Sequence, residues 1–394
     1  MKHRIVVLGA GYTGTSAAGR LARSLHRDDV EITLVNADTE FVERVRMHQL
    51  ATGQRLKSRP LTAILAGTGV KVRTAWVTAI DPDAKTVAVE EAGGPAEIAY
   101  DTLVYALGSA VADHGVPGVA EHAHNVAGKG SALRLRDRLA ALPAGATVLV
   151  AGGGLTGIES VTEIAESRPD LDVALVTRGE LGDWLGEKGR EHLRAVLGRL
   201  GVTVHEHTDI TSVSASAVTT GDGGDIPAEV TVWTTGFAVH PIAAASTLAV
   251  APNGRIIVDA SVRSVSHPDV YAVGDAAHAE GAGGKTLRMS CASGIPLSWH
   301  AADVITARLT GGEVPTTTIG YSQQCVSLGR RDALIQKVHE DDTAKPEAMT
   351  GRFAARYKEL ICRGAAWGTA HPTLLLPRRR RRVVVDRARS DAAR

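Results

Sequence analysis

Two stretches of the chain share one pattern of apolar strand, glycine turn and helix. The first has an apolar run over 4–8, a turn with Gly9, Gly11 and Gly14, and a helix-like stretch, and a second apolar run follows over 30–35. Short apolar runs joined by a stretch of helical spacing are typical of strand–helix–strand units in parallel sheets. This part of the sequence therefore predicts such a unit, with glycines at its first turn.

The same pattern returns about 140 residues further along, with a run over 147–151, then Gly152, Gly154 and Gly157, and a second strand over 173–176. In G-x-G-x-x-G turns the first glycine permits the tight turn, and the second lets the backbone approach a pyrophosphate. The third lets helix and strand pack closely, while the helix N-terminus offers N–H groups to the anion. Two complete units in one chain predict two bound dinucleotides.

Both units depart from the usual pattern where the second strand ends. An acidic residue there commonly binds the ribose hydroxyls, but this chain has Asn36 and Thr177. Asn36 can still accept a hydroxyl hydrogen bond. Thr177 is followed by Arg178, whose guanidinium can pair with a 2′-phosphate or simply be an exposed arginine. The choice between NADH and NADPH stays open.

Composition narrows the class of protein. The chain has 394 residues, enough for two or three domains, and its formal net charge of +1 gives no reason to expect a nucleic-acid partner. Its three cysteines, Cys291, Cys325 and Cys362, form no C-x-x-C pair. We therefore expect neither a redox disulfide nor a metal site, and interpret the cysteines as packing residues.

Targeting signals are not evident. The chain enters its first strand after four residues, and no window approaches the roughly 18–20 apolar residues of a spanning helix. We expect a cytoplasmic protein, with contact at the inner membrane surface left open. Near the end, Leu374–Leu376 precede the basic run Arg378–Arg382. This segment fits either peripheral contact with an anionic membrane or a solvated tail.

Three further segments carry a family resemblance: 102–109 with Gly108, 230–237 with Gly236, and 268–277 with Gly274 and Asp275. Together with the glycine turns, they resemble the two-dinucleotide-binding-domain flavoproteins of the pyridine nucleotide–disulfide oxidoreductase superfamily. The resemblance implies FAD as cofactor and NAD(P)H as co-substrate. It also implies that Asp275 binds the ribityl chain, and that Gly108, Gly236 and Gly274 belong to the cofactor sites.

Within this superfamily the sequence is most similar to type II NADH dehydrogenases, with apoptosis-inducing-factor-like proteins close by. The segment 152–159 resembles "GGGxTGVE", and Glu163 matches a second acid one turn later. The resemblance implies that Glu159 lies near nicotinamide and flavin, where a carboxylate can orient the carboxamide or move a proton. Its alternative role is that of an acid at a helix start. Arg44 and His48 lie in a segment expected beside the flavin ring, and either is a candidate to protonate a quinone.

The resemblance covers roughly residues 4–310 and implies an α/β fold with two Rossmann-like dinucleotide-binding domains. We expect the FAD domain at 1–115 and 262–312, interrupted by the NAD(P)H domain at 116–261. The segment 313–394 is expected to pack over the flavin or to form a homodimer surface, and ends in the basic tail.

The predicted function is an FAD-dependent NAD(P)H oxidoreductase that passes hydride through the flavin to a quinone or quinone-like acceptor. The stretch 288–294 lacks the glutamine that type II dehydrogenases carry near the quinone. Two alternatives therefore stay open: a tailoring oxidoreductase for a specific (poly)cyclic organic substrate, and a redox-gated binding protein. The sequence does not identify the acceptor.

Overall fold

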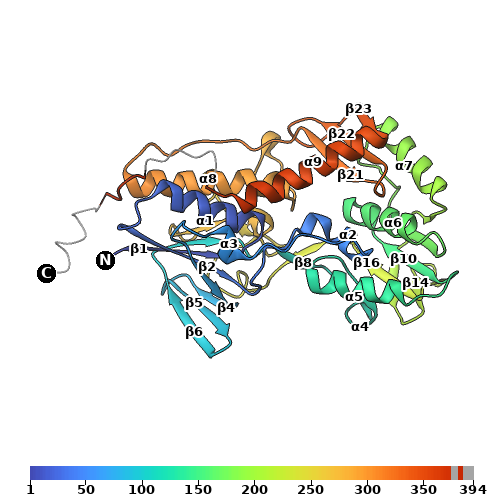
Figure 1. The fold of residues 1–394 in the computed structure, drawn as a ribbon, viewed down its shortest axis with the longest axis horizontal. Helices are drawn as coiled ribbons and strands as arrows, with labels where there is room; N and C mark the ends of the chain where they lie inside the picture. The colour runs from blue at the N-terminus through green and yellow to red at the C-terminus, as the bar shows by residue number, and fades with distance from the viewer. Residues whose placement is uncertain (374–379, 385–394) are drawn as a thin grey trace.

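The first glycine turn belongs to a five-stranded parallel sheet of order β19-β7-β1-β2-β3. A computed structural model describes residues 1–373 and 380–384 of the chain (Figure 1). The strands of this sheet are β1 (His3–Leu8), β2 (Val30–Asn36), β3 (Lys71–Thr74), β7 (Thr102–Tyr105) and β19 (Val270–Ala272). Strand β19 pairs with β7 although about 165 residues separate them, so the chain returns to this sheet after building the second one.

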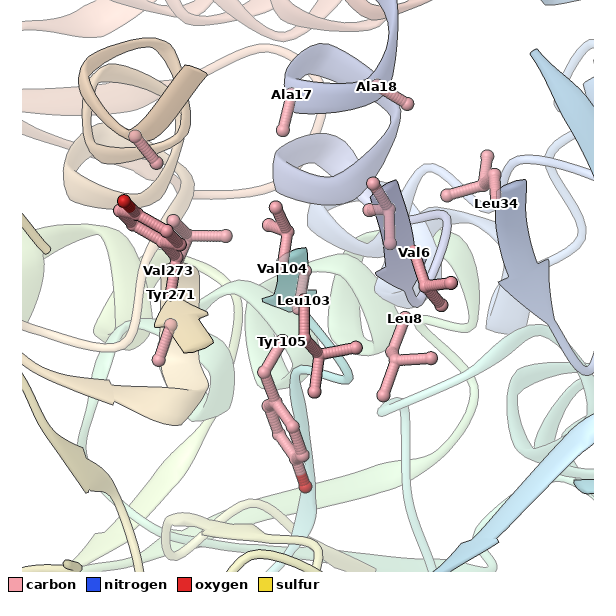
Figure 2. Close-up of a cluster of buried hydrophobic side chains, with 14 of the residues drawn as sticks. Val6, Leu8, Ala17, Ala18, Leu34, Leu103, Val104, Tyr105, Tyr271 and Val273 are labelled. Atoms are coloured by element: carbon pink, nitrogen blue, oxygen red, sulfur yellow. The ribbon is translucent and has the colours of Figure 1, made fainter. Parts of the chain in front are cut away.

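Helices α1 (Tyr12–Ser24) and α8 (Cys291–Thr310) pack side by side over one face of this sheet (Figure 1). Figure 2 shows Ala17 and Ala18 of α1 above the buried side chains of Val6, Leu34 and Val104. The small alanines let the helix approach the strands closely. The central part of the sheet is buried: the apolar parts of β1, β7 and β19 are continuous runs, as is typical of parallel strands covered on both faces. Strand β2 and the edge strand β3 also contain polar residues and are less buried.

The second glycine turn belongs to another five-stranded parallel sheet, of order β12-β11-β10-β16-β9, with its own apolar core. Its elements are β9 (Ala123–His124), α5 (Lys129–Ala140), β10 (Thr147–Ala151), α6 (Leu155–Ser167), β11 (Asp172–Val176), α7 (Glu187–Arg199), β12 (Thr203–His205) and β16 (Val230–Trp233). The predicted α/β fold with two Rossmann-like sheets is confirmed.

Antiparallel strands β8 (Ser109–Val111) and β17 (Phe237–Val239) pair where the chain passes between the two sheets. After α8, the chain forms an antiparallel sheet of β21 (Gln323–Ser327), β22 (Ala333–Val338) and β23 (Ala344–Thr350), followed by α9 (Gly351–Ala370). Strand β21 packs against α6, and α9 runs back to α1 (Figure 1). The C-terminal part therefore touches both parallel-sheet units.

The remaining elements are short. They are η1 (Arg44–Arg46), α2 (Met47–Ala51), α3 (Leu61–Ile64), β4 (Trp76–Asp81), β5 (Thr86–Glu91), β6 (Gly94–Ala99), α4 (Val119–His122), β13 (Ile210–Val213), β14 (Ala217–Thr220), β15 (Asp225–Pro227), β18 (Ile256–Ile257), η2 (Gly274–Ala276), β20 (Ala277–His278) and η3 (Ala282–Gly284). Within residues 1–373 and 380–384, no helix is both long and apolar enough to span a bilayer.

Candidate active site

One cavity of about 1390 Å³ reaches both glycine turns. Its wall includes residues 9–13 of the first turn, residues 152–156 of the second, and side chains of α8 and α9. Pockets for a single small ligand usually measure roughly 300–1,000 Å³. This cavity is larger, and because it extends over the carboxyl ends of both parallel sheets, it has room for two extended ligands.

The three glycines of the first turn have different surroundings. A Cβ on Gly9 would lie 2.3 Å from the carbonyl oxygen of Ala106, and a Cβ on Gly14 would lie 1.8 Å from the carbonyl oxygen of Gly9. Gly11 lines the cavity, and a Cβ there would meet no atom within 4 Å. Gly9 and Gly14 are therefore required by the protein's own packing, whereas Gly11 leaves its backbone open to a ligand. This arrangement fits a dinucleotide pyrophosphate.

The second turn repeats this division. A Cβ on Gly152 would lie 2.8 Å from the carbonyl oxygen of Thr234, and one on Gly157 would lie 1.8 Å from that of Gly152. A Cβ on Gly154 would again meet nothing within 4 Å, and Gly154 lines the cavity. The second turn therefore also fits a dinucleotide, because its first and third glycines have no room for a Cβ and its second leaves the backbone open to a ligand.

Asn36 connects the end of β2 to the first turn. Its Oδ1 accepts a hydrogen bond from Ala10 N at 2.9 Å, and its Nδ2 donates to the carbonyl oxygen of Asp38 at 2.8 Å. An amide oxygen has two lone pairs, so Oδ1 keeps one for a ribose hydroxyl. Asp38 also lines the cavity. This carboxylate lies two residues beyond the usual position of the acid, so the sequence pattern does not mark it.

At the second turn, Thr177 lies against Gly153 and both line the cavity. Arg178 is 84% exposed and forms an ion pair with Asp209, and both of these side chains also line the cavity. The end of β11 therefore presents a cation that a carboxylate from a neighbouring segment holds in place. The sequence could not place Asp209 here, because it lies 31 residues away in a loop.

The other predicted cofactor-site residues divide into two groups. Gly108, Gly236 and Asp275 line the cavity, and Ser109 Oγ donates to Asp275 Oδ2 at 2.6 Å. Gly274 does not line it. A Cβ on Gly274, whose φ is +70°, would lie 2.9 Å from the Thr13 side chain. Gly274 therefore allows η2 to approach α1 closely and so positions Asp275.

Three side chains that are at most 14% exposed meet at the cavity wall. Glu159 of α6 lies 3.0 Å from Lys358 Nζ of α9 through Oε1, and 3.8 Å from His48 Nδ1 of α2 through Oε2. The backbone N–H of Ser327 also donates to Glu159 Oε1 at 3.0 Å. Carboxylate, ammonium and imidazole thus come from three different elements, and all of them line the cavity.

The charges of this cluster follow from burial and pairing. Burial alone would raise the pKa of Glu159, but Lys358 and His48 outweigh it and hold that pKa below its usual value. Burial would likewise lower the pKa of Lys358, but Glu159 holds it above its usual value. Burial lowers the pKa of His48 to about 4. At neutral pH the cluster is an ion pair beside a neutral imidazole.

Arg44 lies in the same cavity, and its Nη1 is 3.3 Å from where a Cβ on Gly108 would be. Within the described parts of the chain, Arg44 forms no ion pair. A guanidinium keeps its proton in proteins. The sequence suggested Arg44 and His48 as candidates to protonate a quinone. In the structure Arg44 supplies positive charge to the cavity, whereas His48 is neutral.

Two glutamines that no sequence motif marks line the cavity from β21. Gln324 is buried, and its Nε2 donates to Asp342 Oδ1 at 2.9 Å. Gln323 Nε2 bonds the Tyr357 hydroxyl at 3.0 Å. The stretch 288–294 lacks a glutamine, but β21, a different element of the cavity wall, supplies two. No motif marks them, so only the fold could bring them to notice.

All three cysteines also line the cavity and are free thiols. Burial raises the pKa of Cys291 to about 12 and that of Cys325 to about 11, and it raises the pKa of Cys362 as well. These thiols therefore hold their protons at neutral pH and are poor nucleophiles. Within the described residues, no group of three or more His, Cys, Asp or Glu side chains is arranged to hold a metal ion.

Comparison with known proteins gives consistent matches. The family model described as pyridine nucleotide-disulphide oxidoreductase matches residues 3–303. An NADH dehydrogenase-like protein of Mycobacterium tuberculosis is 31% identical over 323 residues, covering 76% of this chain and 78% of the relative. A demethylphylloquinone reductase of Synechocystis is 26% identical over 347 residues, covering 84% of this chain and 86% of the relative.

Solved structures share the fold. The NDH2 of Plasmodium falciparum in complex with NADH has a TM-score of 0.79 at 14% identity, covering 95% of this chain and 97% of that one. The sulfide:quinone oxidoreductase of Aquifex aeolicus has a TM-score of 0.78 at 19% identity, covering 95% of this chain and 93% of that one. At these identities the likeness concerns the fold alone.

Proposed function

Because the chain belongs to the pyridine nucleotide-disulphide oxidoreductase family, we propose that it is an FAD-dependent NAD(P)H dehydrogenase with a quinone acceptor. The observation that carries the proposal is the single cavity that joins two dinucleotide-type glycine turns to a buried Glu159–Lys358 pair. Its relatives include type II NADH:quinone oxidoreductases and a demethylphylloquinone reductase. These names favour a quinone over the alternative acceptors that the sequence left open.

The proposal assigns the first turn to FAD. Gly9, Gly11 and Gly14 would form the pyrophosphate cradle, Asn36 would bind the ribose, and Asp275 the ribityl chain. When bound, the flavin supplies the ability to take up and release two electrons. The FAD domain then consists of 1–115 and 262–312, and β21 and α9 of the C-terminal segment cover the cavity.

The second turn is assigned to the nicotinamide nucleotide, with Gly152, Gly154 and Gly157 as its cradle and 116–261 as its domain. Glu159 holds or releases a proton at Oε2, since Oε1 is occupied by Lys358 and Ser327. His48 is neutral and lies 3.8 Å from this oxygen, and Arg44 offers fixed positive charge to electron-rich ligands.

The function is tested by anaerobic turnover with NADH and a panel of benzoquinones and naphthoquinones. The proposal expects quinone-dependent NADH oxidation with several members of each class. Turnover confined to one organic substrate class would instead indicate a tailoring oxidoreductase. Bound flavin that is reduced without any turnover would indicate a redox-gated binding protein.

Arg178 sets the preference between the two nucleotides in this proposal. Charge-assisted hydrogen bonds contribute about 1.5–3 kcal/mol, so Arg178→Ala is expected to lower kcat/KM for NADPH about tenfold or more. The value for NADH should change little. Asp209→Ala should raise kcat/KM for NADPH, because it removes a carboxylate that repels the 2′-phosphate. Arg199→Ala, an exposed arginine of α7 paired with Asp332, is the control. Equal losses for both nucleotides in Arg178→Ala would contradict this role.

Peripheral membrane contact is proposed through the outer face of α9. Phe353, Leu360 and Trp367 recur every seven residues and are 69%, 66% and 49% exposed. Exposed arginines of the same helix accompany them, namely Arg352, Arg356 and Arg363. Apolar and aromatic side chains beside basic ones are typical of helices that lie in a membrane surface. The opposite face of α9 lines the cavity. A helix α9 that lies in the membrane surface would therefore bring the cavity close to a lipid-soluble quinone.

The basic run Arg378–Arg382 lies only partly within the described residues. There, Arg382 Nη1 pairs with Asp29 Oδ1 at 2.9 Å, so its charge is already matched by the protein. We expect Phe353→Ser/Leu360→Ser to abolish co-sedimentation with phosphatidylglycerol vesicles. Val265→Ser, which changes an apolar residue that is 57% exposed outside α9, should have no effect. Deletion of 374–394 tests the tail separately. Unchanged sedimentation of the double variant, together with a shift from dimer to monomer in light scattering, would assign this face to a homodimer instead.

A further inference from the structure

Three glutamates form a row along one side of α6, from the cavity to the protein surface. Glu159, Glu163 and Glu166 are four and three residues apart, which places their side chains on the same helix face. Glu159 lines the cavity, Glu163 is 1% exposed, and Glu166 is partly exposed. At 1.5 Å per residue, the row covers roughly 10 Å of helix.

Glu163, in the middle of the row, is a buried carboxyl without a cationic partner in the described residues. Gln54 Nε2 donates to its Oε1, whereas its Oε2 has no hydrogen-bond partner there. Burial raises the pKa of Glu163 to about 7, although Arg330 opposes the shift. The side chain can therefore carry a proton near neutral pH, and an unpartnered oxygen is available to exchange it.

The inner end of the row can receive a proton. Glu159 Oε1 already accepts from Lys358 and Ser327, so Oε2 is the oxygen left for protonation. The outer end reaches solvent, because Glu166 is partly exposed. Its Oε2 accepts a hydrogen bond from the backbone N–H of Arg330.

We propose that Glu163 passes to Glu159 the one proton that the reduction of a quinone takes from solvent. The inference rests on the proposed function. A nicotinamide hydride brings two electrons and one proton, and a quinol contains two electrons and two protons more than its quinone. The second proton therefore comes from water. The O–H bond of Glu163 breaks as one forms at Glu159 Oε2, and Glu159 in turn loses this proton to a quinone oxygen. The Glu163 carboxylate then regains a proton from solvent at the Glu166 end.

The pH dependence follows from the groups around Glu163. Glu159 and Glu166 of α6 favour retention of its proton, and Arg330 after β21 favours its loss. His48 of α2 is neutral, and Lys358 of α9 is already paired with Glu159. Glu163 is thus protonated below about pH 7. Turnover should fall as the pH rises through this value, because Glu163 is then deprotonated and has no proton to pass on.

Glu163 acts through Glu159 and is a positioning residue, so its test requires more than a loss of activity. We would compare Glu163→Gln, which keeps the shape without the acid, with Glu163→Asp, which keeps the acid. Glu191→Gln on the exposed side of α7 is the control. Each holoenzyme is assayed for FAD content and for flavin reduction by NADH. Quinone turnover is then measured in H₂O and in D₂O from pH 5.5 to 8.5, which is about 1.5 pH units on either side of neutrality, where Glu163 would titrate.

We expect Glu163→Gln to bind FAD and to be reduced by NADH like the unaltered protein. Its quinone turnover below pH 7 should fall at least about tenfold, with no decline across neutrality. Glu163→Asp should regain part of the turnover and its pH dependence. An unchanged pH profile and solvent isotope effect in Glu163→Gln would overturn the relay. If the unaltered protein is itself inactive with all quinones, the proposed function fails instead.

Discussion

Gly14→Ala is expected to abolish FAD binding, whereas Gly157→Ala is expected to keep FAD bound but block its reduction by NADH. In each case the new Cβ would lie 1.8 Å from a backbone carbonyl oxygen, that of Gly9 or of Gly152. Backbone cannot yield as a flexible side chain does, so the turn that receives the pyrophosphate has to shift. The two variants carry the same clash at two different sites and therefore separate the two nucleotides.

FAD content per protein and the rate of flavin reduction measure these outcomes. Gly198→Ala is the matched control, because a Cβ there meets nothing within 4 Å on helix α7. In an exposed helix, alanine is about 0.5–1 kcal/mol more favourable than glycine, so this variant should retain both properties. If Gly157→Ala lost FAD and Gly14→Ala kept it, the assignment of the two turns would be reversed.

Lys358→Met is expected to destabilise the folded protein by about 3–5 kcal/mol and to suppress quinone turnover. The substitution leaves Glu159, which is 8% exposed, as a buried carboxylate without its cation. Breaking one side of a buried ion pair has a cost of that order. The free energy of unfolding of the FAD-loaded protein and steady-state kinetics with a quinone measure the two effects.

Two further variants give this prediction its controls. Lys358→Met/Glu159→Gln should recover most of the lost stability, because no unpaired charge stays buried, while turnover stays low. Arg363→Met removes an exposed cation from the same helix, where its pair with Glu359 is worth at most about 1 kcal/mol. A stability change for Lys358→Met as small as that for Arg363→Met would refute the claim that the pair is buried and important.

The sequence predicted the fold well where local pattern decides it. Apolar runs of strand length and the spacing of Gly9, Gly11 and Gly14 are local signals, and the same holds for the second turn. Burial of the central strands β1 and β10 explains why their apolar runs lack polar alternation. The fold class, the family and the need for two nucleotides could therefore be inferred from the amino-acid sequence alone.

The acceptor side of the cavity could not be predicted in this way. Lys358 lies on α9 almost 200 residues after its partner Glu159, and no motif marks it. Gln323 and Gln324 come from an antiparallel sheet outside the segments that resemble the family. Their position depends on how the C-terminal part packs on α6, a tertiary contact that local pattern does not encode.

The most direct test of the account is rapid anaerobic mixing of the purified protein with NADH and, separately, with NADPH. An oxidised flavin absorbs at about 370 and 450 nm, a property of the cofactor. We predict that the protein binds FAD and that these bands bleach rapidly with at least one nucleotide. A protein that binds no flavin after reconstitution with FAD, or whose bound flavin neither nucleotide reduces, would contradict the claim that one cavity brings the two nucleotides together.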